Sequence, residues 1–403
     1  MKISLENFNV FYILLVVFGF PIFVTINLSL GFDTSQGSII YRALVVFFSF
    51  VLIFKSINKF SKIKFGLFSL FLFLYSLRLI LDLSIRNISN PYIEAEKIYL
   101  FHFGGIIIPV IAVSFMNINA IKLNTSFFYM SFVQCLFVLI GLYLLYGTDF
   151  FQLFSDRYMY GDDSINDGTG SPLNPILVSR VGTVLHTLLF YNILFKKIKV
   201  KLYFYVVGFV LAITLILLGS SRGPLVTCIL LSIIMIFLKF KNSKIQNKFI
   251  VLFGISVVLI GLNYLIITYS ESIGLINRLN ESLLSQSDFN YGGREYHFKS
   301  AINQFINNPF FGDKIFDNYK DYYPHNLFLE SFMALGFFGG LLFAYLSIIN
   351  IFKGVKKNTA NIYITFVCFT LFVFTSGAIW NSFEFWILLA IMNKFRKNNF
   401  VTT

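Results

Sequence analysis

Charged residues and cysteines are both scarce in this chain of 403 residues. Asp, Glu, Lys and Arg together make up 13% of it, roughly half the share that is usual in soluble domains. The three cysteines, Cys135, Cys228 and Cys368, all lie inside apolar runs and form no CxxC pair. This pattern argues against a disulfide framework and against a thiolate metal site.

Metal-ligand clusters are also missing from the sequence. No group of His, Asp and Glu residues has the spacing of a metal site, so we expect neither a metal nor a cofactor. Basic residues are in excess, with a formal net charge of +13, but they are spread over several separate connections. A nucleic-acid surface would need them gathered on one face or domain, so we expect no nucleic-acid partner.

Apolar side chains, by contrast, are abundant. Hydrophobic residues make up 57% of the chain, and 53 residues are phenylalanine. Apolar runs of about 20 residues, long enough to cross a bilayer core of about 30 Å, recur from end to end. The sequence therefore predicts an all-α polytopic membrane protein, a single integral membrane domain over residues 1–403 with about twelve transmembrane helices. The expected spans are 8–30, 39–54, 65–85, 98–116, 125–146, 175–195, 202–220, 223–238, 249–269, 326–352, 361–378 and 380–393.

Lysine clusters mark every second connection between these spans. The clusters are Lys55 to Lys64, Lys196 to Lys201, Lys239 to Lys248, Lys353 to Lys357 and Lys394 to Lys397, with Lys122 alone in the remaining connection. By the positive-inside rule these connections face the cytoplasm, together with both termini. The first apolar run is too long for a cleavable signal sequence, so we expect it to stay in the membrane.

Two of the connections that face outward are long. The first covers residues 147–174, and the second covers residues 270–325. Apolar residues recur at helical spacing in the second loop, which predicts amphipathic helices. The last of these patterns should end at Asn307-Asn308-Pro309, because proline breaks a helix.

Four residues near the outer rim are candidate site residues, because charge is costly in a membrane unless it is paired or functional. His325 stands at the mouth of a long apolar helix, which we expect Pro324 to begin. Arg222 lies in a very short outward turn, Arg294 opens an amphipathic pattern, and Arg180 lies near the outward end of a span. The alternative is a surface histidine with arginines that extend toward the membrane surface.

Other polar residues in the spans have a simpler interpretation. Arg78, Asp82 and Arg86 follow one another at four-residue intervals, so they share a helix face and should neutralise one another. The remaining residues that we expect to serve packing are His102, His186 and Glu330.

Three segments in the second half carry a family resemblance. They are the Ser221-Arg222-Gly223-Pro224 turn, the helix that Arg294 opens and that ends at Asn308-Pro309-Phe310-Phe311-Gly312, and the Tyr323-Pro324-His325-Asn326 entry followed by a Gly-x-x-Gly tract. In this order they resemble the O-antigen ligase and polymerase superfamily (WaaL and Wzy). The similar region runs from about residue 172 to residue 345.

The resemblance implies a fold, a reaction and partners. The fold is a GT-C-like helical fold, and the protein would be a glycosyltransferase of the bacterial cytoplasmic membrane, with its active site outside the cytoplasm. The implied donor is an oligosaccharide linked to undecaprenyl diphosphate, and no metal is needed. Membrane lipid, a chain-length regulator and a flippase are the other implied partners.

Polymerases and ligases of this superfamily share these motifs. A polymerase joins lipid-linked repeat units of O-antigen or capsule, whereas a ligase transfers the polymer to the lipid A-core of lipopolysaccharide. The Ser-Arg-Gly-Pro-Leu and Tyr-Pro-His-Asn segments favour a polymerase. The ligase stays open, because Arg294 and Gly312 miss the Arg-x15-Gly spacing of some polymerases. A polysaccharide flippase is less favoured, since a transporter should show two related halves. A non-catalytic assembly scaffold would make the rim residues dispensable.

The chemistry of such a transfer assigns roles to the rim residues. The acceptor hydroxyl needs a base, and the departing diphosphate needs positive charge. His325 suits the first task, and a reference pKa of about 6.5 predicts that activity falls between roughly pH 7 and pH 6. Arg180, Arg222 and Arg294 suit the second, because planar guanidinium groups bind phosphate oxygens bidentately.

Overall fold

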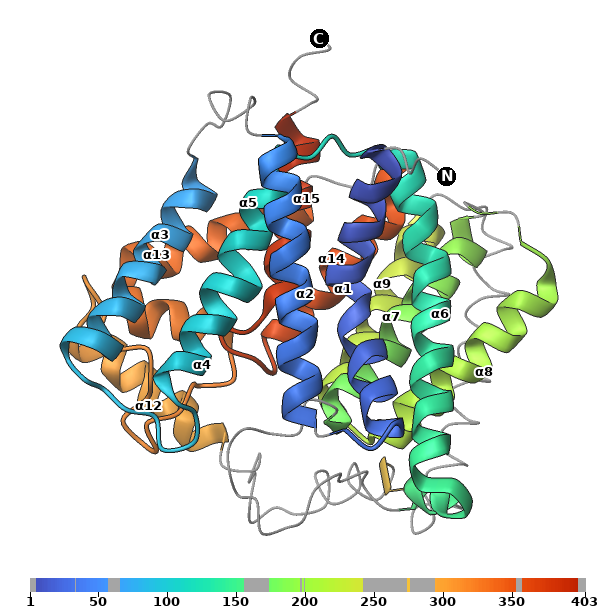
Figure 1. The fold of residues 1–403 in the computed structure, drawn as a ribbon, viewed down its shortest axis with the longest axis horizontal. Coiled ribbons are helices and arrows are strands. Elements are labelled where there is room, and N and C mark those ends of the chain that lie inside the picture. The colour runs from blue at the N-terminus through green and yellow to red at the C-terminus, as the bar shows by residue number, and fades with distance from the viewer. Residues whose placement is uncertain are drawn as a thin grey trace.

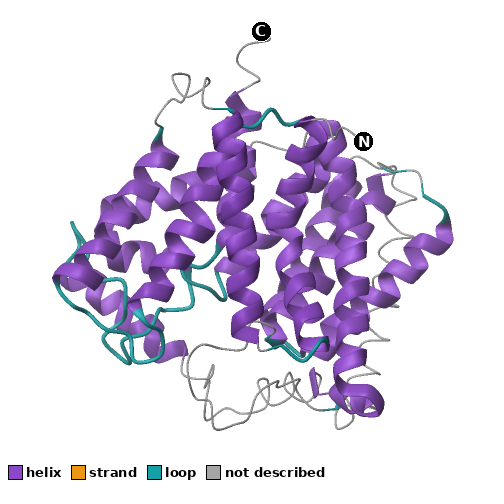
Figure 2. Ribbon diagram, in the orientation of Figure 1, coloured by secondary structure: helices purple, strands orange, loops and turns teal. Residues whose placement is uncertain are grey.

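The computed structural model of the protein describes residues 5–32, 34–56, 66–155, 174–195, 198, 200–241, 274–275, 294–352 and 357–397. Every regular element within these ranges is a helix (Figure 2), as the sequence predicts. Nine of the helices in the described ranges are long and apolar enough to cross a membrane. The protein is therefore an all-α polytopic membrane protein.

The helices follow the apolar runs closely. The long ones are α1 (Leu5–Ser29), α2 (Thr34–Lys55), α3 (Leu67–Ile80) with a π-helical end (Leu81–Ile85), α4 (Ala95–Tyr99) joined to α5 (Ile108–Phe115) through a π-helical stretch (Leu100–Ile107), α6 (Ala120–Tyr146) with a 3-10 extension (Gly147–Phe154), α7 (Pro175–Phe195), α8 (Leu202–Gly219), α9 (Arg222–Lys241) and α13 (Leu327–Phe352). The shorter ones are α12 (Arg294–Asn307), α14 (Ala360–Val373) and α15 (Phe383–Lys397). The expected span 249–269 lies outside the described residues, as do residues 156–173 of the first long loop and residues 270–273 and 276–293 of the second.

Two expected boundaries were wrong. The spans placed at 361–378 and 380–393 left almost no loop between them, but α14 ends at Val373 and α15 begins at Phe383. Local backbone chemistry explains the difference, since Gly377 has a φ of +111° and the side chain of Asn381 binds the amide of Ala378. The result is a nonhelical connection over residues 374–382.

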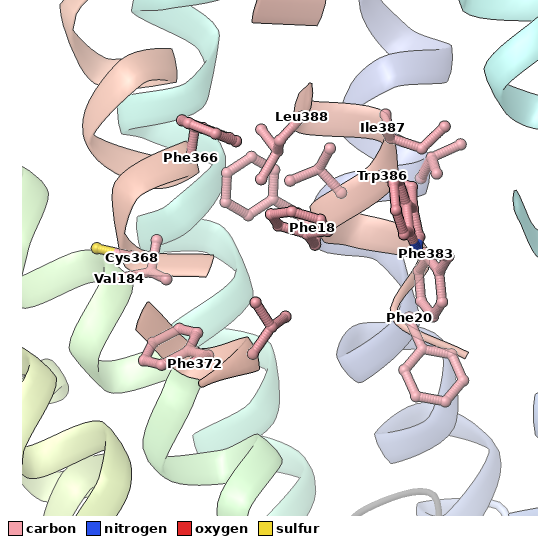
Figure 3. Packing of buried hydrophobic residues seen from close by; sticks show 14 of the residues in the cluster. Phe18, Phe20, Val184, Phe366, Cys368, Phe372, Phe383, Trp386, Ile387 and Leu388 are labelled. Atoms are coloured by element: carbon pink, nitrogen blue, oxygen red, sulfur yellow. The ribbon is translucent and has the colours of Figure 1, made fainter. Parts of the chain in front are cut away.

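Aromatic packing holds the bundle together. Trp380 and Trp386, the two tryptophans of the chain, are completely buried. Buried side chains of α1, α14 and α15 pack in one cluster, among them Phe18, Phe366 and Trp386 (Figure 3). Because lipid tails are as apolar as these side chains, close packing and polar contacts between helices supply most of the association energy in a membrane.

The helix α13 is broken at Gly336, although its hydropathy is continuous. Gly336 has φ +66° and ψ −163°, and a Cβ there would lie 2.3 Å from the carbonyl oxygen of Phe310. The absence of a side chain lets the turn after α12 pack against the break, where the amide of Phe337 binds the carbonyl of Pro309 at 2.6 Å. The expected single span 326–352 is therefore two helical segments, and the turn that follows α12 packs against the break between them.

The segment between α12 and α13 is held by charges at the end of α3. Asp82 forms ion pairs with Arg78 at 3.8 Å and with Arg86 at 3.3 Å, so the three charges do neutralise one another. The same three residues also bind the segment's backbone: Arg78 binds the carbonyls of Phe311 and Asp313, Arg86 binds the carbonyl of Asp313, and Asp82 accepts from the amide of Ile315.

The two ends of the helix bundle differ in the elements that they carry. The chain enters α1 and leaves α15 at the same end, and α12 lies at the opposite end with the loop that follows it (Figure 1). The helix α12 ends at Asn307, as the Asn307-Asn308-Pro309 sequence predicts. Residues 294–325 of the second long loop are thus the polar helix α12 and the segment that the charges at the end of α3 hold in place, and both lie at this end of the bundle.

Candidate active site

The connection between α14 and α15 brings the separate motifs together. Residues 374–376 of this connection, here called the carbonyl loop, offer three successive backbone carbonyls to side chains from three different helix ends. The bonds run from Asn326 Nδ2 to Phe374 O (2.9 Å), from Arg294 Nη1 to Thr375 O (2.8 Å) and from Arg180 Nη2 to Ser376 O (3.2 Å). Residues from three separate parts of the sequence therefore share one anchor.

A buried carboxylate holds the part of the α14–α15 connection that follows the carbonyl loop. Glu330, which is completely buried on α13, accepts a hydrogen bond from the hydroxyl of Tyr75 at 2.5 Å and another from the amide of Ile379 at 2.8 Å. The interpretation of Glu330 as a packing residue is thus confirmed, and its contacts link α3 and α13 to the α14–α15 connection. The backbone that carries the carbonyl loop is held in place from both ends.

Arg180 lies on α7 with only part of its surface exposed. Its guanidinium group lies 5.3 Å from the ring centre of Phe372, and its Nε atom is buried without a hydrogen-bond partner among the described residues. A small cavity next to it has two further polar residues in its lining, Gln134 and Glu384. The Nε atom of Arg180 is therefore a donor that its bond to Ser376 leaves unused.

Arg294 is the first residue of α12 and is partly buried. Besides its bond to Thr375, its guanidinium group is close enough to that of Arg180 for their charges to interact, and the Glu384 carboxylate also acts on Arg180. The two guanidinium groups repel each other because both are positively charged. Their repulsion would be relieved by an anion bound between them.

The structure corrects the expected start of the helix after His325. Pro324 does not begin it: the helix begins at Leu327, and the side chain of Asn326 accepts hydrogen bonds from the amides of Phe328 (2.9 Å) and Leu329 (3.1 Å). Asn is among the preferred residues for this capping position. His325 therefore precedes the cap, in a left-handed conformation with φ +55°.

The His325 imidazole sits in an aromatic pocket. Its ring centre lies 4.5 Å from that of Tyr323, 5.3 Å from that of Tyr322 and 5.8 Å from that of His297. Its Nδ1 atom is buried and has no partner within the described part of the chain. An unpartnered ring nitrogen at this position can accept a hydrogen bond from a substrate hydroxyl.

Burial makes His325 difficult to protonate. Desolvation first, and then the nearby positive charge of Arg294, lowers the pKa of His325 to about 3. The imidazole is therefore neutral throughout the physiological range, which a base requires. The expected loss of activity between pH 7 and pH 6 cannot come from this residue in the free protein.

Arg222 begins α9 two residues after Ser220, which has a left-handed φ of +40°. Its neighbour Gly223 packs on the carbonyl loop, since a Cβ there would lie 2.9 Å from the Oγ1 atom of Thr375. The Nε atom of Arg222 is buried without a partner among the residues described. The structure thus places the Arg222 turn at the same loop, although it shows no contact between this guanidinium and the other site residues.

Sequence reasoning missed two parts of this arrangement. The carbonyl loop acts through backbone oxygens, which have no sequence signature. The pair of His297 and Asp317, with 2.5 Å between Nδ1 and Oδ2, had a signal that was overlooked. His297 lies three residues after Arg294, so both lie on one face of α12. His102 and His186, by contrast, are packed against Ser76 and Cys228 within the helices, as expected.

Comparison with known proteins agrees with the motifs. Residues 207–344, about a third of the chain, match the family model described as O-antigen ligase. The matched segment includes Arg222, Arg294 and His325, whereas Arg180 and the carbonyl loop lie outside it. No curated protein matches the chain. The match supports the O-antigen ligase and polymerase superfamily and does not separate the two activities.

Proposed function

We propose that this chain, which carries the domain of the O-antigen ligase and polymerase superfamily, is a polymerase of lipid-linked oligosaccharide repeat units. In this proposal the growing glycan leaves undecaprenyl diphosphate and is joined to a new lipid-linked repeat unit. The observation that carries it is the convergence of Arg180, Arg294 and Asn326, the residue after His325, on the carbonyl loop. Two cations and a neutral base at one end of a membrane bundle suit a donor with a lipid tail and a diphosphate.

The arginines would bind the diphosphate. A guanidinium group has five N–H donors in a rigid fork, and Arg180 uses only some of them on the carbonyl loop. Arg180 and Arg222 each have a buried Nε without a partner in the described ranges. Because these groups are held before substrate arrives, they could stabilise the charge that develops as the diphosphate departs without first reorganising. Arginine would thus supply the positive charge that a metal supplies in other transferases.

His325 would act on the acceptor. The acceptor O–H bond breaks as its oxygen bonds the anomeric carbon of the donor, and the bond from that carbon to the diphosphate oxygen breaks with its electron pair. His325 takes the proton. The negative charge of a bound diphosphate would oppose the effect of Arg294 and make the imidazole a stronger base in the complex than in the free protein. Direct displacement would turn an α-linked donor into a β-linked product.

A polymerase is preferred to a ligase because of the Ser221-Arg222-Gly223-Pro224 and Tyr323-Pro324-His325-Asn326 segments. The two activities differ in the acceptor, so purified protein in lipid vesicles should be given lipid-linked repeat units alone or together with lipid A-core. A ladder of lipid-linked polymers from repeat units alone supports the polymerase. Transfer only in the presence of lipid A-core would overturn it in favour of the ligase.

The sidedness of the site belongs to the same proposal. The lysine pattern favours a multi-pass protein of the bacterial cytoplasmic membrane, with both termini in the cytoplasm and α12 on the outer face. The helical ends support this assignment, since α1 begins and α15 ends opposite to α12 (Figure 1). A flippase would instead need its polar residues near mid-membrane and between two related halves.

A further inference from the structure

A second histidine faces the site and has no role in the mechanism above. His297 lies on α12 with 7% of its surface exposed, and its Nδ1 atom is 2.5 Å from the Oδ2 atom of Asp317. Asp317 is completely buried. Its other oxygen accepts hydrogen bonds from the amides of Tyr319 (2.8 Å) and Lys320 (3.1 Å). Both oxygens of the carboxylate are therefore fixed, and the plane of the His297 ring is fixed with them.

This contact determines the tautomer of His297. The Asp317 carboxylate can only accept, so the proton of a neutral His297 lies on Nδ1 and the lone pair lies on Nε2. No described residue donates a hydrogen bond to Nε2. The ring stands nearly perpendicular to the His325 ring, at 79° with 5.8 Å between the centres. The structure shows no direct hydrogen bond between the two imidazoles, and one bridging water molecule would connect them.

The two histidines differ in the charge beside them. A proton on His325 would lie near the Arg294 guanidinium, and burial together with this charge lowers the pKa of His325 to about 3. A proton on His297 would lie against the Asp317 carboxylate, which attracts it. A positive charge on His297 is thus offset by a carboxylate, whereas a positive charge on His325 is opposed by a guanidinium group.

We propose that His297, oriented by Asp317, receives the proton of the acceptor hydroxyl through His325. This inference rests on the proposed function. His325 accepts the hydroxyl proton on one ring nitrogen and gives up the proton of its other nitrogen to Nε2 of His297. His325 ends as its second neutral tautomer, His297 becomes an imidazolium paired with Asp317, and the leaving diphosphate carries away the electron pair of the broken carbon–oxygen bond. His297 and Asp317 thus act through His325 as positioning residues.

The alternative role of this pair is purely structural. The bond between His297 and Asp317 also fastens α12 to the segment before α13, so its loss could misplace Arg294. A structural fault would weaken donor binding and would not respond to a small base. A proton-transfer fault should lower kcat at an unchanged KM for the lipid-linked donor, and added imidazole should restore part of the loss.

Two variants separate these roles in the vesicle transfer assay. Asp317→Asn keeps an oxygen for the amides of Tyr319 and Lys320 but removes the charge, and His297→Ala removes the imidazole. We expect kcat to fall at least about 10²-fold in both, with KM within about 2-fold, and imidazole to raise kcat of His297→Ala in a saturable way. His186→Ala is the matched control, because His186 is packed between helices against Cys228, and should show neither effect.

Each outcome bears on one claim. Near-normal kcat in either site variant, or a loss in folded His297→Ala that imidazole does not relieve, overturns the role of the pair and leaves the proposed function standing. Absence of any transfer by the wild-type protein overturns the proposed function itself. Unfolding midpoints of all three variants in detergent show whether each protein is folded.

Discussion

Replacing Gly336 by alanine should damage the site from a distance. The backbone there has φ +66°, a conformation that costs a residue with a side chain about 1–3 kcal/mol. The new methyl group would also lie 2.3 Å from the carbonyl oxygen of Phe310 and 2.7 Å from the amide nitrogen of Gly312. Neither atom belongs to a flexible side chain, so backbone must move, at a further cost of about 1–3 kcal/mol.

The expected destabilisation is therefore about 2–6 kcal/mol, which corresponds to a fall in the unfolding midpoint of roughly 2–7 °C in detergent for a chain of 403 residues. Activity should fall as well, because the displaced turn directly follows α12, which carries Arg294. Gly105→Ala is the matched control, since an added Cβ there would meet no atom within 4 Å. A Gly336→Ala protein as stable and active as the Gly105→Ala protein would refute the packing account of the break in α13.

Three further results are expected. Arg222→Lys and Arg294→Lys keep the charge but lose the fork, so each should reduce polymer formation at least about 10²-fold at a normal membrane level, and near-normal polymer in both would assign them to packing. In the His297→Gln variant the residual kcat/KM should stay flat from pH 8 to pH 5, because burial lowers the pKa of His325 to about 3; a decline between pH 7 and pH 6 would show that His325 titrates near its ordinary value. A reporter fused after residue 290 should be extracytoplasmic and one after residue 243 cytoplasmic, and a cytoplasmic signal at 290 would contradict the proposed side of the site.

Hydropathy predicted the fold well because the bilayer sets the length of each span. The long helices of the described ranges follow the apolar runs. The polar helix α12 ends at Asn307, as the Asn-Asn-Pro sequence predicts. The break at Gly336 escaped prediction, since it depends on a turn 24 or more residues away that packs against it. A continuous apolar run contains no information about such a tertiary contact.

The site was predicted in part. Arg180 and His325 could be found because each is a costly residue at the end of an apolar run, and Arg294 because it opens an amphipathic pattern. The structure brings Arg180, Arg294 and the residue after His325 to one loop. That loop could not be found, because its backbone carbonyls are the same for any sequence. The position of His325 before the helix was also missed, since Pro324 and Asn326 are both good helix-starting residues and only the hydrogen bonds of Asn326 decide between them.

The most direct test of the account is transfer by purified protein in vesicles that contain lipid-linked repeat units and no helper proteins. Wild-type protein should form polymer and release one undecaprenyl diphosphate for each new glycosidic bond. His325→Ala should lose at least about 10²-fold of this rate while keeping its membrane level and unfolding midpoint. A His325→Ala protein that polymerises at a rate close to wild type would contradict the central claim that this imidazole takes the proton of the acceptor.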